Sequence, residues 1–234
     1  MSMPARSSST PTAHPLHAPV TPAVTPDDMF GPLKTVGQAM TVQRGSELFA
    51  EGDEADHLYQ IRSGVLRLCK LLPDGRRQIE QFGLPGDLVG FEPGTIHNAT
   101  AEAVTDCVII RYRRSRVEGI ASNDPRLARN ILGLAIKQLS DAQRRLVLLG
   151  RNTAMERLAF FILEMMERTD AAKCIELSMS RTDIADYLGL TTETVSRLFT
   201  NLRQDGIITL PNANRLVVHD LAALEALAEG DEGL

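Results

Sequence analysis

The sequence predicts an α+β protein in which an antiparallel β-roll is followed by a long helix and a winged helix-turn-helix. Short apolar stretches divided by turn residues fill the first half of the chain, as is typical of antiparallel strands. After Pro125 the apolar period changes to that of a helix, and two sets of helix start signals surround Gly189. We therefore expect a disordered tail over 1–28, the roll over 29–121, the long helix over 122–150 and the winged helix-turn-helix over 151–234.

The bulk composition fits a globular chain but does not indicate a function. The 234 residues are 43% hydrophobic and 24% charged, enough for an ordinary core. No run of about 18 apolar residues and no apolar N-terminal stretch is present, so we expect a cytoplasmic protein without a membrane span. The formal net charge of -5 gives no support for nucleic-acid binding, so any such function has to rest on local features.

The cysteines exclude two kinds of site. Cys69, Cys107 and Cys174 lie far apart and include no C-x-x-C spacing, so the sequence predicts free thiols without a disulfide framework or a metal cluster.

The expected tail over 1–28 is rich in Pro, Ser, Thr and Ala. Such a composition buries too little apolar surface to offset the entropy of ordering.

The roll is predicted from alternation and turns. Tyr59 and Ile61 alternate with polar neighbours, as in a half-buried strand, whereas the stretch from Cys107 to Tyr112 is apolar on both faces, as in a core strand. Pro73, Asp74 and Gly75 form a turn signal between strands. Many short strands at this spacing indicate a small barrel or roll.

The long helix carries an apolar seam whose members recur at alternating steps of three and four residues. They are Leu132, Ala135, Leu139, Ala142, Leu146 and Leu149. The seam could pack on the rest of its own chain, but its charged flanks favour a two-stranded coiled coil between two copies of the chain. We therefore predict a homodimer. Gly150 and Asn152 are expected to end this helix, and a capping box from Thr153 to Glu156 starts the next.

A helix-turn-helix is predicted between Arg181 and Thr200. The sequence from Ser180 to Asp183 is a capping box, so a helix should begin at Arg181. Gly189 can adopt the left-handed conformation that a tight turn needs, and Thr191 can cap a second helix. A small residue, Ala185, stands where the two helices should cross. After them, Ile207–Leu210 and Arg215–Val218 read as the hairpin of a wing.

The outward side chains of the second helix fit base edges in the DNA major groove. They are Thr192, Glu193, Ser196 and Arg197. Arginine can donate two hydrogen bonds to guanine, and glutamate can accept one from cytosine. Alternatively, Glu193 and Arg197 form an ordinary surface ion pair four residues apart, worth about 0.2 to 0.5 kcal/mol. Their place just after the turn favours base contact.

Residues 40 to 225 resemble the CRP/FNR family of bacterial transcription regulators, in particular its FixK and FNR branches. The stretch from Gly45 to Asp53, continuing to Gly64, is similar to the family's cyclic-nucleotide-binding-like roll. The stretch from Ala185 to Arg197 is similar to its DNA-reading signature. The resemblance implies a homodimeric activator that binds a palindrome with TTGA-type half-sites, works with RNA polymerase and serves oxygen-limited metabolism.

The chain departs from the family where the cofactors of other branches bind. Phe91, Ala99 and Thr100 stand where the branch that binds cyclic AMP has a Glu and an Arg-Ser pair, so a phosphate would lack a cation. There is no Cys before Cys69, so the N-terminal cysteines that hold the FNR iron-sulfur cluster are missing. We therefore expect a FixK-type regulator with no cofactor.

Two alternatives stay open. An enzyme of the cupin type, which is also built on a β-roll, would need an H-x-H pair of metal ligands. The chain instead has His97 alone, with His57 forty residues earlier. Alternatively, a regulator of the same fold could sense gas or redox state through haem on a histidine or through a thiol. Cys174 is then the candidate redox residue, because it lies in a polar stretch just before the reading motif.

Overall fold

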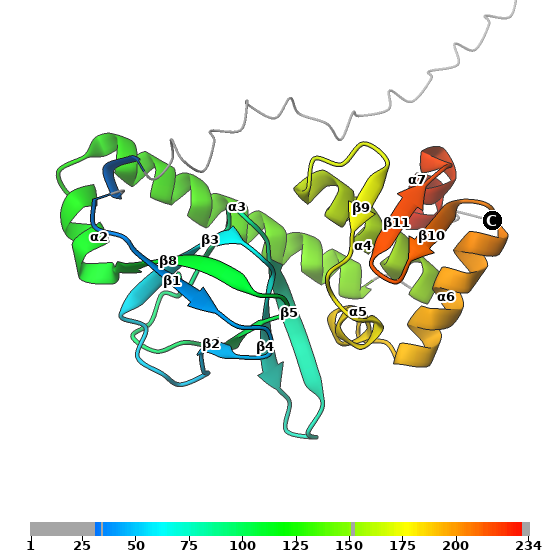
Figure 1. Cartoon of the computed structure of the whole chain (residues 1–234), viewed down its shortest axis with the longest axis horizontal. Coiled ribbons are helices and arrows are strands. Elements are labelled where there is room, and N and C mark those ends of the chain that lie inside the picture. The colour runs from blue at the N-terminus through cyan, green and yellow to red at the C-terminus, as the bar shows by residue number, and fades with distance from the viewer. Residues whose placement is uncertain (1–30, 34, 151–152, 231–234) are drawn as a thin grey trace, which may run out of the picture.

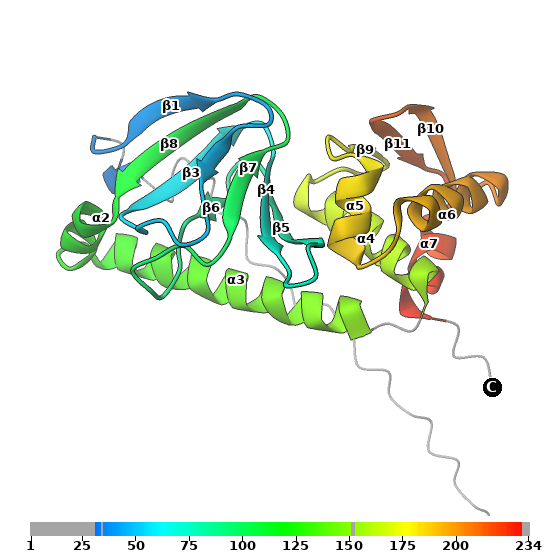
Figure 2. The same cartoon turned by 90° about the horizontal axis from the view of Figure 1, so that it is seen from below.

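The structure is a computed structural model that describes residues 31–33, 35–150 and 153–230. The tail predicted over 1–28 lies outside these residues. Figure 1 shows the β-roll on one side, the domain with the helix-turn-helix on the other, and the long helix α3 running from one to the other. In the view from below, α3 lies along the roll over most of its length (Figure 2).

The roll consists of two four-stranded antiparallel sheets, ordered β1-β8-β3-β6 and β2-β7-β4-β5. Its core includes Ile61, Leu66 and Ile109, none of which has exposed surface. Gly64 (φ 86°) makes the tight turn between β3 and β4, where a Cβ would clash with the Asp106 carbonyl oxygen. The roll predicted from the sequence is confirmed. Its elements are η1 (Gly31–Leu33), β1 (Gln38–Val42), β2 (Glu47–Phe49), β3 (His57–Ser63), β4 (Leu66–Leu71), β5 (Arg77–Gly83), β6 (Leu88–Val89), β7 (Thr100–Ala103) and β8 (Cys107–Arg113).

Two helices follow the roll. The short helix α2 (Arg114–Ala121) was not predicted, because its sequence is polar and it buries only Val117. The long helix α3 (Pro125–Gly150) begins at the proline, whose fixed φ suits the first helical position, and ends at the predicted glycine. It buries Leu127 and Leu148, so only part of its apolar surface packs on its own chain.

The C-terminal domain combines four helices with a small sheet. The sheet has three strands in the order β10-β11-β9, one more than the predicted hairpin. The turn is also tighter than predicted: Pro211 to Asn214 were expected to join the two strands, but Asn212 pairs with Arg215, so only Ala213 and Asn214 turn the chain. The elements are α4 (Ala154–Arg168), β9 (Cys174–Glu176), α5 (Arg181–Leu188), α6 (Thr192–Gln204), β10 (Ile208–Asn212), β11 (Arg215–Val218) and α7 (Leu221–Glu229).

One buried hydrophobic cluster joins the roll to the C-terminal domain. Ile79 and Phe82 of β5 belong to the same buried cluster as Phe161 of α4 and Tyr187 of α5. The Phe82 ring lies 5.2 Å from the Tyr187 ring and 6.3 Å from the Phe161 ring. Aromatic contacts of this kind fix α5 against the roll, which leaves α6 on the side that faces away from it (Figures 1 and 2).

Candidate nucleic-acid interface

The first helix of the motif, α5, starts and stops at the predicted residues. Ser180 is its N-cap: the Oγ atom accepts the Asp183 N–H at 3.0 Å, and the Asp183 carboxylate accepts the Ser180 N–H at 3.0 Å. Gly189 ends the helix with φ 65° and ψ 38°, the left-handed conformation. The capping box and the glycine turn are therefore confirmed.

The second helix, α6, is positioned by its cap and by its buried face. The Thr191 Oγ1 atom accepts the Thr194 N–H at 3.2 Å and so caps the helix. Val195 and Phe199 are buried against α5, and Ala185 of α5 is only 1% exposed. A larger side chain than alanine at this crossing would hold the two helices apart.

Arg181 stabilises the crossing of the two helices in a way that the sequence did not reveal. Its guanidinium carbon lies 3.4 Å from the centre of the Phe199 ring. A cation over an aromatic face is attracted by the electron-rich ring, and burial strengthens this contact. Burial also lowers the pKa of Arg181. The residue thus connects the start of α5 to the middle of α6.

The outward face of α6 presents the predicted base-reading residues. Glu193, Ser196 and Arg197 are exposed. Thr192 is half-buried, and its hydroxyl donates to the Thr182 hydroxyl at 3.4 Å. The structure thus places three of the four residues on one open helix face, whereas Thr192 also packs against α5.

Glu193 and Arg197 are not held to one another. The ion pairs found among the described residues do not include these two side chains. The pKa of Glu193 is lowered by its backbone N–H at the start of α6, by the Thr191 hydroxyl and by the charge of Arg197. The carboxylate is therefore ionised at neutral pH and can accept a hydrogen bond, while the Arg197 guanidinium can donate.

Four charged residues orient α5 on the roll, and we call them the roll clamp: Arg67, Arg77, Asp183 and Asp186. Arg67 Nη1 and Arg77 Nη2 both lie 2.8 Å from Asp183 Oδ1. Arg77 Nη2 also lies 2.7 Å from Asp186 Oδ2. The Asp183 side chain is only 4% exposed, so its negative charge is balanced by arginines that come from β4 and β5.

The wing places a further arginine at the surface of the domain. Arg215 on β11 is exposed, and its Nε atom donates to the Cys174 Sγ atom at 3.0 Å. Cys174 itself is half-buried on β9, whereas Cys69 and Cys107 are buried and burial raises the pKa of both thiols. The redox role of Cys174 stays a prediction, and its contact with Arg215 was not foreseen.

The predicted seam on α3 has an exposed part and a covered part. Leu132, Leu139 and Leu146 are 59%, 61% and 73% exposed. Leu149 is 38% exposed, Ala142 is exposed, and Ala135 is half-buried beside the roll. Two apolar residues that the seam omitted, Ile136 and Val147, are 60% and 59% exposed. We call Leu132, Ile136, Leu139, Leu146 and Val147 the α3 stripe.

The described residues include neither a metal-binding cluster of side chains nor a helix that could cross a membrane. No group of three or more His, Cys, Asp or Glu side chains is arranged to hold a metal ion. No helix in the described ranges is both long and apolar enough to cross a membrane.

The chain matches two protein-family models. Residues 39–124 match the cyclic nucleotide-binding domain, and residues 156–227 match the Crp-like helix-turn-helix domain. The first range covers the roll and α2, and the second covers the interface described above.

Curated relatives and a solved structure match most of the chain. The nitrogen fixation regulation protein FixK of Azorhizobium caulinodans is 44% identical, over 87% of this chain and 86% of the relative. The transcriptional activator protein Anr of Pseudomonas protegens is 33% identical, over 87% of this chain and 86% of the relative. The structure of FixK2 from Bradyrhizobium japonicum is 41% identical with a TM-score of 0.78, covering 82% of this chain and 97% of that one.

Proposed function

Because the chain belongs to the CRP/FNR family, in its FixK-like branch, we propose that it acts as a homodimer that reads a palindromic operator and activates transcription. That it is a transcription regulator with a DNA-binding helix-turn-helix, and not an enzyme, follows from its relatives, which are named regulators. The observation that carries the proposal is the open face of α6, where Glu193, Ser196 and Arg197 are exposed and Glu193 is free of an ion pair with Arg197.

Each of these three side chains suits a different hydrogen-bonding group on the base edges. Arg197 can donate a bidentate pair to guanine O6 and N7, and the ionised Glu193 can accept from cytosine N4. Ser196 lies between them on the helix and can donate or accept. These residues stand where FNR-like branches place their base contacts, so we propose a TTGA-type half-site. Thr192 is half-buried and lies at the edge of the reading face.

The homodimer is supported by the α3 stripe. Its five large apolar side chains are each 59% or more exposed on one helix, which is unusual for a helix that packs only on its own chain. Their spacing suits a two-stranded coiled coil. Two reading helices related by a two-fold axis would then meet two half-sites about 34 Å apart, one turn of DNA.

We also propose that the roll works without a cyclic nucleotide. The residues that would meet a phosphate do not suit one: Ala99 is buried and apolar, and the Thr100 hydroxyl already accepts the Glu51 N–H at 3.0 Å. Nearby, His97 stacks on Phe49 with ring centres 3.7 Å apart, and its Nδ1 atom lies 3.1 Å from the Glu92 carboxylate. A buried phosphate beside this carboxylate would be repelled.

Activation is proposed from the relatives. Anr of Pseudomonas protegens and FnrL of Cereibacter sphaeroides, 33% and 34% identical to this chain, are both named transcriptional activators. An activator requires a contact with RNA polymerase, which we therefore propose as a further partner.

The base-reading proposal predicts unequal losses from two substitutions. Arg197→Ala removes a charge-assisted donor pair, so it should weaken binding by about 1 to 3 kcal/mol at the cognate guanine and little on nonspecific DNA. Glu193→Ala removes a carboxylate that the phosphates repel, so nonspecific affinity should rise while discrimination at its base pair falls. The measurement is the affinity of each variant for the operator and for operators with single base-pair changes, at fixed salt.

Arg215→Ala on the wing is the comparison variant, because we propose that this exposed arginine contacts a phosphate and not a base. Its loss should then weaken binding to every sequence alike and flatten the salt dependence. If Arg197→Ala and Glu193→Ala behaved in the same uniform way, the two residues would not read bases.

A further inference from the structure

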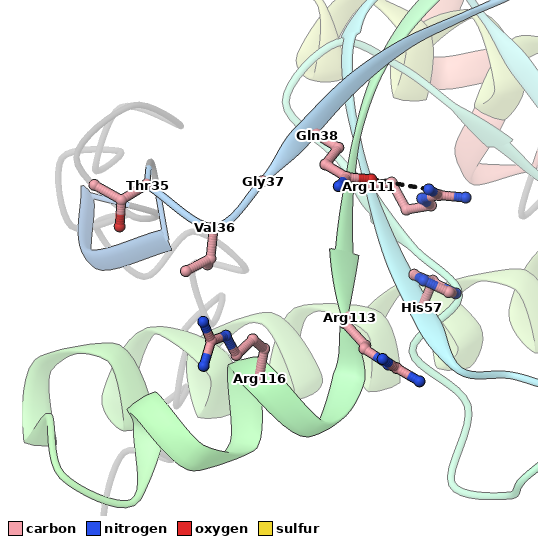
Figure 3. A pocket seen from close by; sticks show the side chains of 8 residues that line it. All are labelled: Thr35, Val36, Gly37, Gln38, His57, Arg111, Arg113 and Arg116. Carbon is pink, nitrogen blue, oxygen red and sulfur yellow. Dashed lines mark hydrogen bonds between the residues drawn. The ribbon is translucent and has the colours of Figure 1, made fainter.

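A basic pocket opens at the end of the roll that lies far from α6. Its volume is about 640 Å³, and four segments of the chain contribute to it (Figure 3). These are residues 35–38, the start of β3, the end of β8 and the first turn of α2. The lining residues are Thr35, Val36, Gly37, Gln38, His57, Arg111, Arg113 and Arg116.

Three arginines concentrate positive charge in this pocket. Among the described residues, the ion pairs within 4.0 Å include none of Arg111, Arg113 and Arg116. His57 pairs directly with Arg113 across β3 and β8, with Arg111 two residues further along β8. Burial lowers the pKa of His57, and the charges of Arg111 and Arg113 lower it further, against an opposing effect of Asp56. His57 is therefore uncharged at neutral pH, and the positive charge of the pocket comes from Arg111, Arg113 and Arg116, which a bound anion would balance.

Two parts of the pocket wall, the backbone at Gly37 and the guanidinium of Arg111, are held in place without a ligand. The backbone at Gly37 passes so close to β8 that a Cβ there would lie 2.6 Å from Ile110 Cγ2 and 2.7 Å from Tyr112 Cε1. Arg111 Nη2 donates to the Gln38 side-chain oxygen at 2.9 Å, which holds that guanidinium at the rim (Figure 3). A preformed site of this kind loses less conformational entropy when it binds.

We propose that this pocket binds a small polyanion, a molecule that carries two or more phosphate or carboxylate groups. Arginines are suited to such groups because the planar guanidinium makes paired hydrogen bonds to them. The volume lies within the range of about 300 to 1,000 Å³ that is usual for small-molecule sites. Among the described residues of the lining, Val36 is the only large apolar side chain, so the oxyanion groups, and not an aromatic or aliphatic part, dominate recognition.

Neither DNA nor an acidic protein surface fits the pocket as well. The operator is excluded by position, since α2 and the start of β1 lie at the opposite end of the molecule from α6 in both views (Figures 1 and 2). An acidic polypeptide would need a broad open surface, whereas these three arginines lie within six residues of one another, at the end of β8 and the start of α2, and line one hollow.

Calorimetric titration of the full chain with pyrophosphate, tripolyphosphate and citrate tests the proposal, the first two as phosphate sources and the third as a carboxylate source. We expect saturable binding of at least one of the three. Combined Arg111→Gln, Arg113→Gln and Arg116→Gln should then abolish it, and Arg113→Gln or Arg116→Gln alone should weaken it at least about tenfold. The two single variants replace exposed side chains, so they keep the test valid if the triple variant does not fold.

Two controls place the binding in this pocket. Arg129→Gln removes an exposed arginine of α3 that does not line the pocket, and Arg197→Ala removes one from the reading face. Both should bind the polyanion as the unmodified chain does. The proposal is overturned if none of the three anions binds, if the triple variant binds them equally well, or if Arg197→Ala alone abolishes binding. It is also overturned if an oligo-aspartate peptide binds through these arginines while the three small anions do not.

Discussion

Replacing both Leu139 and Leu146 by Asp is expected to convert the protein to a monomer and to lower its operator affinity by about 10² to 10⁴-fold. Each aspartate would face its counterpart across the two-stranded coiled coil, so the substitution replaces apolar contacts with buried like charges. A monomer can hold only one half-site, and so it loses the gain in affinity that comes from linking two reading helices. Sedimentation velocity and operator titration measure the two effects on the same sample.

The two leucines suit this test because they are 61% and 73% exposed in the single chain, so their loss should leave the fold of the monomer intact. Arg126→Asp is the matched control, since it places an acid on the same helix, at an exposed position ahead of the α3 stripe. It should stay dimeric and bind normally. A double variant shown to be monomeric that kept full operator affinity would refute the dimer as the DNA-binding form. A double variant that stayed dimeric would refute the α3 stripe as the dimer interface.

Asp183→Ala is expected to lower the free energy of unfolding by about 3 kcal/mol, more than any other single change discussed above. The substitution removes the capping box of α5, and it also leaves Arg67 and Arg77 without their shared partner in a partly buried interface. Chemical denaturation of both proteins at neutral pH measures the difference. Asp220→Ala is the matched control, because Asp220 caps α7 through the Ala223 N–H and has no arginine partner among the described ion pairs. It should cost only about 1 kcal/mol.

The effect of Asp183 should also depend on pH. Burial raises the pKa of this carboxyl, but hydrogen bonds from Ser180 and the charges of Arg67 and Arg77 outweigh burial and bring the pKa below its ordinary value. A carboxyl whose pKa is lower in the folded state stabilises the fold fully above its unfolded pKa, about 3.9, and less as the pH falls through the folded pKa. The difference in free energy of unfolding between the unmodified protein and Asp183→Ala should therefore become smaller below about pH 4. If Asp183→Ala lowered the free energy of unfolding at neutral pH by no more than Asp220→Ala does, the ion pairs of the roll clamp would not stabilise the fold.

The features that the sequence predicted well are local in the chain. The caps at Ser180 and Thr191 and the turn at Gly189 each depend on residues within a few positions of one another, and all three form as expected. The turn of the wing was placed too broadly, and the strand from Cys107 to Tyr112 is not buried on both faces, since Val108 is 39% exposed. Apolar residue type alone does not tell which face of a strand the rest of the fold covers.

The features that the sequence missed join distant segments. Asp183 lies 116 residues from Arg67 and 106 from Arg77, so no local pattern could reveal the roll clamp. The strand Cys174–Glu176 has only three residues, too few for a period, and forms because β11 pairs with it. On α3, the predicted seam followed strict steps of three and four residues. It included Ala135, which turns toward the roll, and omitted the exposed Ile136 and Val147. The prediction failed there because a helix of 3.6 residues per turn drifts from the heptad period.

Selection of binding sites from a random DNA pool by the purified full chain, with no effector added, tests the central claim most directly. The claim is that two copies of α6 read two identical half-sites through Glu193, Ser196 and Arg197. The selected sequences should then share an inverted repeat with TTGA-type halves whose centres lie about 34 Å apart, and the preference at the guanine should be lost when Arg197→Ala protein is used. Enrichment of a direct repeat, of a single half-site, or of the same inverted repeat by the Arg197→Ala protein would contradict the account.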